Sequence, residues 1–184
     1  DVYKRQALIL TVVSMCDYFV KCAPIFKFNP EDSFSNFSHE GIKNAQPLPW
    51  QASEIVLKDR IQEEASQVIK LAIDKNKTLS TAESCTGGLI GGTLTAISGS
   101  SSAVEGGVIS YSNNVKQIVL GVSARDIEQV GAVSSEVAAQ MADGSRKTCQ
   151  SDIAVSVTGI AGPGGAVPGK PVGTVWFGLS TDSY

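Results

Sequence analysis

The sequence contains very little histidine, and this scarcity removes most of the familiar catalytic arrangements. Its single histidine, His39, lies among irregularly spaced aromatic residues and prolines. A Ser-His-Asp or Cys-His catalytic group therefore cannot form in the regularly patterned part of the chain. The HExxH motif and any metal site built from several histidines are excluded as well, so we expect no metal. A hydroxyl nucleophile in this protein needs a lysine, a tyrosine or a carboxylate as its base.

Several sequence motifs of hydrolases and nucleotide-binding proteins are also missing. The chain has no GxSxG motif, and no GxGxxG segment opens a helix after a strand. The segment Gly164-Gly-Ala-Val-Pro-Gly169-Lys170 does match the GxxxxGK pattern of a phosphate-binding P-loop, but Pro171 stands where Ser or Thr should bind magnesium. We interpret residues 159–171 instead as a loop that either covers a ligand or simply connects two strands.

Charge and long apolar runs are scarce too. Charged residues make up 18% of the chain and the formal net charge is -3, so no basic field attracts nucleic acid. The longest apolar run, Ala7 to Met15, is shorter than the roughly 20 residues that span a bilayer. The four cysteines fit neither a zinc site nor a dense disulfide framework, and we expect free thiols. Together these features predict a cytoplasmic globular protein with no cofactor, no nucleic-acid partner and no membrane partner.

Residues 1–52 differ in pattern from the rest of the chain. The sequence begins at Asp1 and its first six residues look like translated cloning sequence, after which aromatic residues and prolines follow without a period. We interpret residues 1–52 as an irregular segment, either a targeting segment or linker or a start derived from cloning. A targeting role would direct the protein to an organelle instead of the cytoplasm.

From Ser53 onward, helix and strand signals alternate along the sequence. Apolar spacing, capping residues and glycines predict helices over 53–76, 87–97, 113–120, 123–131 and 134–148, and strands over 78–82, 104–111, 153–157 and 173–180. Asn113 is expected to cap its helix, the helix over 87–97 to be buried, and the last strand to be central because both its faces are apolar. This alternation predicts a three-layer α/β/α domain over residues 53–184 with a mostly parallel or mixed sheet.

The segment Thr81-Ala-Glu-Ser-Cys-Thr-Gly-Gly88 is the strongest local signal, because a strand ends there and a helix begins at once. Such a turn presents hydroxyls beside helix amides, so it can hold an anion or offer Ser84 or Cys85 as a nucleophile. Glu83 can cap those amides or accept a ligand hydroxyl. Cys85 is alternatively a small buried side chain.

Two other segments that follow strands are expected to face the same crevice, namely residues 111–116 and the loop over 159–171. Lys116 can act as a base if burial lowers its pKa. The alternative is an ordinary solvated lysine.

Six motifs in a fixed order give these residues a family context. They are the Thr81–Gly88 segment, Gly99-Ser-Ser101, Tyr111-Ser-Asn113 with Lys116, Gly131-Ala-Val-Ser134, Val157-Thr-Gly-Ile-Ala-Gly-Pro163 and Lys170-Pro-Val-Gly-Thr-Val-Trp176. From about Ile55 to Tyr184 the chain resembles the C-terminal domain of the CinA family of competence/damage-inducible proteins, the nicotinamide-nucleotide amidases.

The resemblance implies hydrolysis of nicotinamide mononucleotide to nicotinate mononucleotide and ammonia, in the recycling of pyridine nucleotides such as NAD, without metal or cofactor. It implies Ser84 as nucleophile, Lys116 as base and Tyr111 as a third catalytic residue. The substrate-binding residues that it implies are Thr86, Gly87, Gly88, Ser100, Ser101, Asn113, Thr158, Gly159 and Gly162. The amides of Thr86–Gly88 would stabilise the oxyanion or bind the phosphate.

Some expectations concern the extent and the assembly of the protein. Residues 1–50 do not match the N-terminal domain that full-length family members often carry, and the family domain continues past Ser180 into a basic segment with a final helix. The domain is therefore expected to be truncated at its C-terminal end. A homo-oligomer is the usual state of a small enzyme of this class.

A second function from a different class also fits these motifs: a non-catalytic module that binds a nucleotide or has a regulatory role. The distance between Ser84 and Lys116 discriminates between the two functions. A separation beyond one bridging water favours the binding module, whereas direct contact favours the enzyme.

Overall fold

The computed structural model describes residues 50–181, with side chains from residue 59 onward. The helices are α2 (Trp50–Asp74), α3 (Leu89–Thr95), the 3-10 helix η3 (Ser100–Ser102), α4 (Asn113–Leu120), α5 (Ala124–Val130) and α6 (Ser135–Cys149). The strands are β1 (Leu79–Glu83), β2 (Val104–Ile109), β3 (Ile153–Gly159) and β4 (Val175–Thr181). The prediction for the N-terminal segment falls almost entirely outside these residues.

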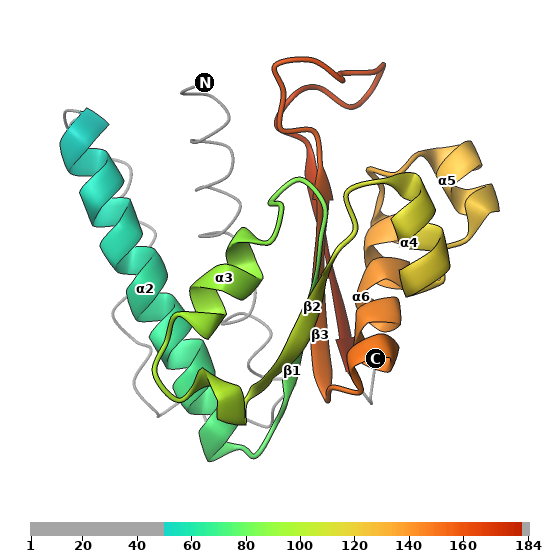
Figure 1. Ribbon diagram of the computed structural model, residues 1–184. Coiled ribbons are helices and arrows are strands. Elements are labelled where there is room, and N and C mark those ends of the chain that lie inside the picture. The colour runs from blue at the N-terminus through green and yellow to red at the C-terminus, as the bar shows by residue number, and fades with distance from the viewer. Residues whose placement is uncertain (1–49, 182–184) are drawn as a thin grey trace, which may run out of the picture.

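The described strands form one mixed sheet with helices on both faces. The strand order is β2-β1-β3-β4; β1 runs parallel to both of its neighbours, and β4 is antiparallel to β3. Helices α2 and α3 cover one face, and α6 covers the other together with α4 and α5 (Figure 1). The predicted three-layer α/β/α fold is confirmed.

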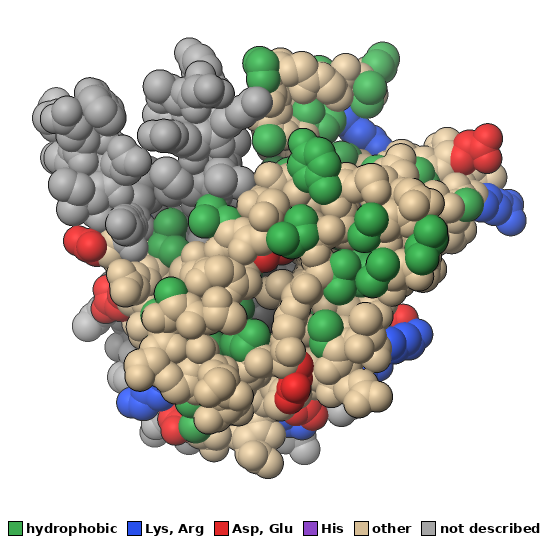
Figure 2. Space-filling model, in the orientation of Figure 1, with side chains coloured by type: hydrophobic (Ala, Val, Ile, Leu, Met, Phe, Trp, Pro, Cys, Tyr) green, Lys and Arg blue, Asp and Glu red, His purple; other side chains and the backbone are tan. Residues whose placement is uncertain are grey.

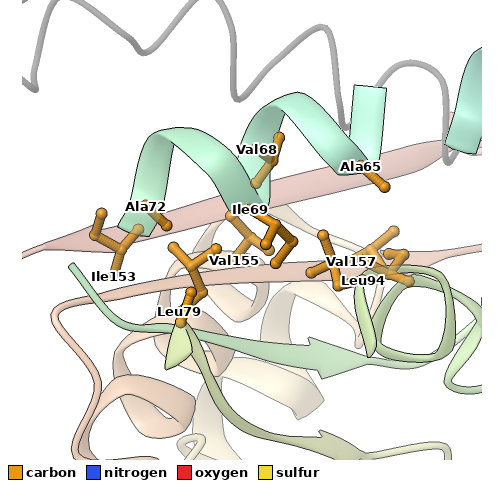
Figure 3. Packing of buried hydrophobic residues seen from close by; sticks show 11 residues of the cluster. Ala65, Val68, Ile69, Ala72, Leu79, Leu94, Ile153, Val155 and Val157 are labelled. Atoms are coloured by element: carbon orange, nitrogen blue, oxygen red, sulfur yellow. The ribbon is translucent and has the colours of Figure 1, made fainter. Parts of the chain in front are cut away.

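Two apolar clusters separate the layers. The larger cluster packs α2 and α3 on the sheet through residues such as Ile69, Leu94 and Val155 (Figure 3). The smaller cluster joins Ala82 of β1 to Leu120 of α4 and Met141 of α6. Successive side chains of a strand point to opposite faces. Residues of β1 therefore face α3 and α6 in alternation. Ala82 faces α6, and Glu83, the last residue of the strand, faces α3.

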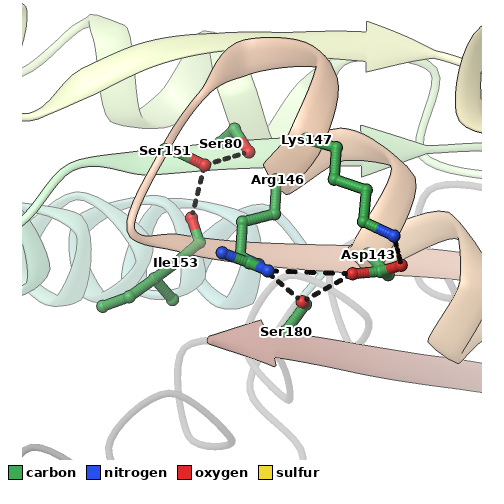
Figure 4. A network of polar contacts seen from close by, with 7 residues as sticks. All are labelled: Ser80, Asp143, Arg146, Lys147, Ser151, Ile153 and Ser180. Atoms are coloured by element: carbon green, nitrogen blue, oxygen red, sulfur yellow. Dashed lines mark hydrogen bonds and ion pairs between the residues drawn. The ribbon is translucent and has the colours of Figure 1, made fainter. Parts of the chain in front are cut away.

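Helix α6 lies unusually close to its neighbours and is held by polar contacts. A Cβ at Gly144 would clash with the main-chain carbonyl of Leu120, so only glycine allows α6 to approach the end of α4. Ser145 Oγ of α6 donates to Ser80 Oγ of β1 at 3.1 Å. Arg146 Nε of the same helix donates to Ser180 Oγ of β4 at 3.0 Å (Figure 4). Directional contacts of this kind fix the position of a helix more strictly than apolar packing alone.

Several sequence predictions about the elements are wrong. Strand β4 pairs with β3 alone among the described strands, so it is an edge strand of this sheet, and Trp176 is 42% exposed. Helix α3 is amphipathic rather than buried, since only Ile90 and Leu94 on it are buried.

Two predicted helix caps are wrong as well. Ser112, not Asn113, caps α4, because its side chain accepts a hydrogen bond from the Val115 amide. The predicted Ser53 cap lies inside α2, whose described part begins at Trp50.

None of the helices in the described part of the chain is both long and apolar enough to cross a membrane.

Candidate active site

The parallel pairing of β1 with β2 brings two distant turns together. Glu83 at the end of β1 pairs with Ile109 at the end of β2, so Ser84 and Ser110 leave the sheet side by side. The Ser110 amide donates to the Glu83 carbonyl at 2.7 Å, and the Ser84 amide donates to Val157 of β3 at 3.0 Å. Ser84 is therefore fixed at the carboxyl edge of the sheet between its two neighbouring strands, where ligands bind in such folds.

Lys116 reaches this position from the first turn of α4 and is only 1% exposed. Its Nζ lies 3.0 Å from Ser84 Oγ, 2.6 Å from the Ser110 carbonyl and 3.5 Å from the Tyr111 carbonyl. None of the ion pairs described for residues 59–181 involves Lys116. Burial lowers the pKa of Lys116 from its ordinary value of 10.5, because the ammonium loses water without gaining a carboxylate partner.

The three contacts of Lys116 Nζ fit both of its protonation states. A neutral amine has two N–H bonds and one lone pair. As an ammonium, Lys116 donates one N–H bond to Ser84 Oγ and the other two to the carbonyls. As a neutral amine, it keeps the two carbonyls as acceptors, and its lone pair faces the Ser84 hydroxyl proton. The arrangement is that of a base in direct contact with a nucleophile.

The carboxylate of Glu83 is fully committed to the start of α3. It accepts the amides of Gly88 at 3.0 Å, Ile90 at 3.1 Å and Gly91 at 2.7 Å, and the side chain is 2% exposed. The sequence left two roles open for Glu83, a cap of the helix amides or an acceptor of a ligand hydroxyl. In the structure Glu83 caps the helix. The Glu83 carboxylate faces the amides of α3, whereas Lys116 contacts Ser84 directly, so Lys116 is the base that the geometry offers.

Cys85, the rival nucleophile, is a half-buried neighbour of the pair. Burial raises the pKa of its thiol to about 11, with a further contribution from the charge of Glu83. Its sulfur packs against the end of β3, where a Cβ at Gly159 would approach it to 3.2 Å. Because the thiolate is the reactive form of cysteine, this environment favours Ser84 as the nucleophile.

Some other residues implied by the resemblance also lie at the site. Tyr111 meets Lys116 through its main-chain carbonyl, while its side chain is 76% exposed. Thr86 is 5% exposed, and its hydroxyl has no hydrogen-bond partner among the described residues. Gly87 and Gly88 have φ of 63° and 97°, which lets the chain turn sharply into α3. Gly88 cannot offer its amide to a ligand, because Glu83 holds it.

Other implied residues lie farther from the Ser84–Lys116 pair or are already engaged. The Thr158 hydroxyl donates to Ala132 at 2.9 Å. Asn113 is exposed at the start of α4, and Gly162 lies in the loop between β3 and β4, where it packs beside Val172.

The structure does not bring Ser100 and Ser101 to this site. Both precede β2, and the adjoining Ala103 accepts the amide of Leu79 at the beginning of β1. They therefore lie at the opposite end of the sheet from Ser84, and Ser100 Oγ donates to the Thr95 carbonyl at 3.2 Å. Within one chain they do not reach the carboxyl edge, and their role in substrate binding stays a prediction.

Sequence reasoning also missed two residues. Ser110 is fully buried and offers the closest acceptor to Lys116, and Ser112 begins the helix that aims this lysine. The pairing register of β1 and β2 would have revealed Ser110, but that register is not visible in the sequence. Ser112 was visible as a serine three residues before Val115.

Apolar side chains surround this end of the molecule. Ile109 is 57% exposed and Ile118 is 74% exposed, and apolar groups are visible over α4 and the adjoining surface (Figure 2). Among the described residues no group of three or more His, Cys, Asp or Glu side chains could hold a metal ion.

Comparison with known proteins places this arrangement in a family context. The model of the CinA C-terminal domain matches residues 61–184. CinA-like proteins of Synechococcus sp. and Trichormus variabilis are 52% and 53% identical to the chain over 116 residues, each match covering 63% of this chain and 28% of the relative. The chain thus spans less than a third of the length of these curated relatives.

Solved structures agree with the sequence matches. The competence/damage-inducible protein CihA from Agrobacterium tumefaciens has a TM-score of 0.65 at 44% identity, covering 66% of this chain and 74% of that protein. A CinA superfamily protein from Escherichia coli has a TM-score of 0.66 at 30% identity, covering 80% of this chain and 82% of that protein.

Proposed function

The chain belongs to the CinA C-terminal domain family, and on that premise we propose that it is an amidase that hydrolyses nicotinamide mononucleotide to nicotinate mononucleotide and ammonia. The observation that carries the proposal is the 3.0 Å contact between Lys116 Nζ and Ser84 Oγ. A buried lysine without a carboxylate partner is unfavourable for folding, and such groups are concentrated at functional sites.

The reaction divides into two steps around Ser84. In the first step, neutral Lys116 takes the Ser84 hydroxyl proton while Oγ attacks the carboxamide carbon. The C–N bond then breaks, Lys116 returns the proton to the departing nitrogen, and ammonia leaves an ester on Ser84. In the second step, a water molecule loses a proton to Lys116 and attacks the ester. The nicotinate product leaves, and the proton returns to Ser84 Oγ.

The alternative is a module that binds a nucleotide without turnover. Such a module has no need of a lysine with a lowered pKa in direct contact with a serine. The distance between Lys116 Nζ and Ser84 Oγ is that of a direct hydrogen bond, which supports the amidase over the binding module.

Release of ammonia from nicotinamide mononucleotide tests the proposal. Ser84→Ala should lower kcat by at least about a thousand-fold, since loss of a nucleophile is among the most damaging changes to an enzyme of this type. Ser66→Ala is the matched control, because Ser66 lies on α2 and its hydroxyl contacts only the Gln62 carbonyl in an exposed position.

Two results would contradict the proposal in different ways. Ammonia release by Ser84→Ala at more than a tenth of the wild-type rate would remove Ser84 as the nucleophile. A wild-type protein that gains thermal stability from nicotinamide mononucleotide but releases no ammonia would be a binding module.

A further inference from the structure

We propose that the main-chain amides of Cys85 and Thr86 are the oxyanion donors of this site, and that the start of α3 is closed to the substrate. The inference rests on the proposed amidase reaction, since it assigns the groups that stabilise the negative oxygen formed when Ser84 attacks. It replaces the sequence-based prediction that assigned this role to the amides of Thr86–Gly88.

The amides at the start of α3 are already engaged inside the protein. Three of them, those of Gly88, Ile90 and Gly91, donate to the Glu83 carboxylate. The other two amides between Gly87 and Gly91 donate to carbonyls of the turn itself, at 3.1 and 3.2 Å. A substrate oxygen or phosphate therefore finds no free amide on this helix, because the internal carboxylate already occupies that place.

The two preceding amides, those of Cys85 and Thr86, have no oxygen acceptor among the described residues. Both lie near the Cys85 sulfur, where they favour the thiolate, but burial outweighs them and keeps the thiol protonated with a pKa of about 11. A protonated thiol is a weak acceptor. The Thr86 hydroxyl, also buried, has no partner either. Two consecutive residues thus hold three donors without a strong acceptor in the protein, which leaves them available to a ligand or to water.

The position of these amides matches the geometry of acyl transfer. The oxyanion forms on the carbon that is bonded to Ser84 Oγ, and the amide of the residue after the nucleophile is a recurrent donor to it. Lys116 approaches Ser84 from the side of β2, whereas the Cys85 side chain packs at the end of β3. Because β1 lies between these strands, the base and the amide donors approach the nucleophile from opposite sides.

Replacing one amide by an ester tests the proposal directly. The reference protein is Cys85→Ala, which keeps the amide at position 85 and removes the thiol. In the test protein lactic acid occupies position 85, so that an ester oxygen replaces the N–H while the side chain stays the same. We expect kcat for ammonia release to fall by about 10²–10³-fold relative to Cys85→Ala, with KM nearly unchanged. The same ester at Ala124, an exposed residue at the start of α5, should leave kcat unchanged.

A second measurement uses the protein without a backbone change. It therefore tests the proposal even if the ester protein fails to fold. An aldehyde analogue of nicotinamide mononucleotide adds to Ser84 Oγ and places an oxygen where the oxyanion forms. In amide NMR spectra, the protons of Cys85 and Thr86 should shift downfield when the analogue binds. Those of Gly88 and Gly91 should stay in place, since Glu83 holds them.

The outcomes separate the inference from the function on which it rests. Equal kcat for the ester protein and Cys85→Ala, or an analogue that shifts Gly88 and Gly91 instead, would overturn the inference and leave the amidase intact. Absence of ammonia release from the wild-type protein would overturn the amidase itself.

Discussion

Replacing Lys116 by methionine should strongly slow turnover and change the way in which stability depends on pH. Methionine has nearly the length of lysine but cannot take a proton, so ammonia release should fall by about 10²–10⁴-fold, the usual contribution of a positioned base. In the wild-type protein the rate should rise with pH through the lowered pKa of Lys116, because only the neutral amine accepts the Ser84 proton. The variant should lack this part of the pH–rate profile.

The effect on stability follows from the direction of the pKa shift. An unfolded lysine titrates near 10.5, and the folded one titrates lower. Between these two pKa values the unfolded chain binds more protons than the folded one, so the free energy of unfolding of the wild-type protein rises with pH. Well inside that interval the slope approaches about 1.4 kcal/mol per pH unit. Below the lowered pKa both states carry the proton, and this contribution to stability is absent.

Urea denaturation at a series of pH values from 7 to 10 measures this slope. With a urea m-value of roughly 1–3 kcal/mol/M, each pH unit inside the interval should move the wild-type midpoint by roughly 0.5–1.4 M relative to Lys116→Met. Both proteins should carry Cys85→Ala, because the raised pKa of the Cys85 thiol gives a slope of opposite sign between 9.0 and about 11. Parallel curves for the two proteins over the whole series would refute the argument that burial lowers the pKa of Lys116.

Two further predictions concern packing and thiol reactivity. Gly144→Ala should destabilise the protein by about 1–3 kcal/mol in thermal denaturation and lower kcat, because the added methyl group meets the carbonyl of Leu120 at the end of the helix that carries Lys116. Gly92→Ala is its control, since that helical position has open space around it, and an equal loss from both changes would contradict the packing argument. Cys85 should react with iodoacetamide at pH 8 far more slowly than an exposed thiol, because its pKa is about 11, and rapid labelling detected by peptide mass mapping would contradict its burial.

Local signals predicted most of the fold because they act within a few residues. Gly121 and Gly131 end α4 and α5 with positive φ, and the Ser123 and Ser134 side chains cap the helices that follow. The order of the strands is not local. The last strand was expected to be central because its side chains are apolar on both faces, yet it pairs only with β3 in the described sheet.

The part of the candidate site that is built from segments following strands could be predicted from the sequence. The sequence identified Ser84 and Lys116, and the structure places their side chains in contact. It could not decide whether Lys116 is solvated, because burial depends on how α4 packs against α6 through Gly144. Ser100 and Ser101 were assigned to the site by the family resemblance alone. They precede the predicted strand over 104–111, whereas Ser84 follows its strand.

The position of β2 at the edge of the described sheet has a consequence for the motion of the site. Ser84 leaves the interior strand β1, whereas Lys116 is supported by β2 and α4, and edge strands separate from a sheet more readily than interior ones. When that edge opens, the lysine meets water and, below pH 10.5, binds a proton. Above the lowered pKa of the closed site, the resulting ammonium must release this proton when the lysine returns to Ser84. Between that pKa and 10.5, opening and closing of the site are thus coupled to proton uptake and release, and a lower pH within this interval lengthens the time that the lysine spends away from the serine.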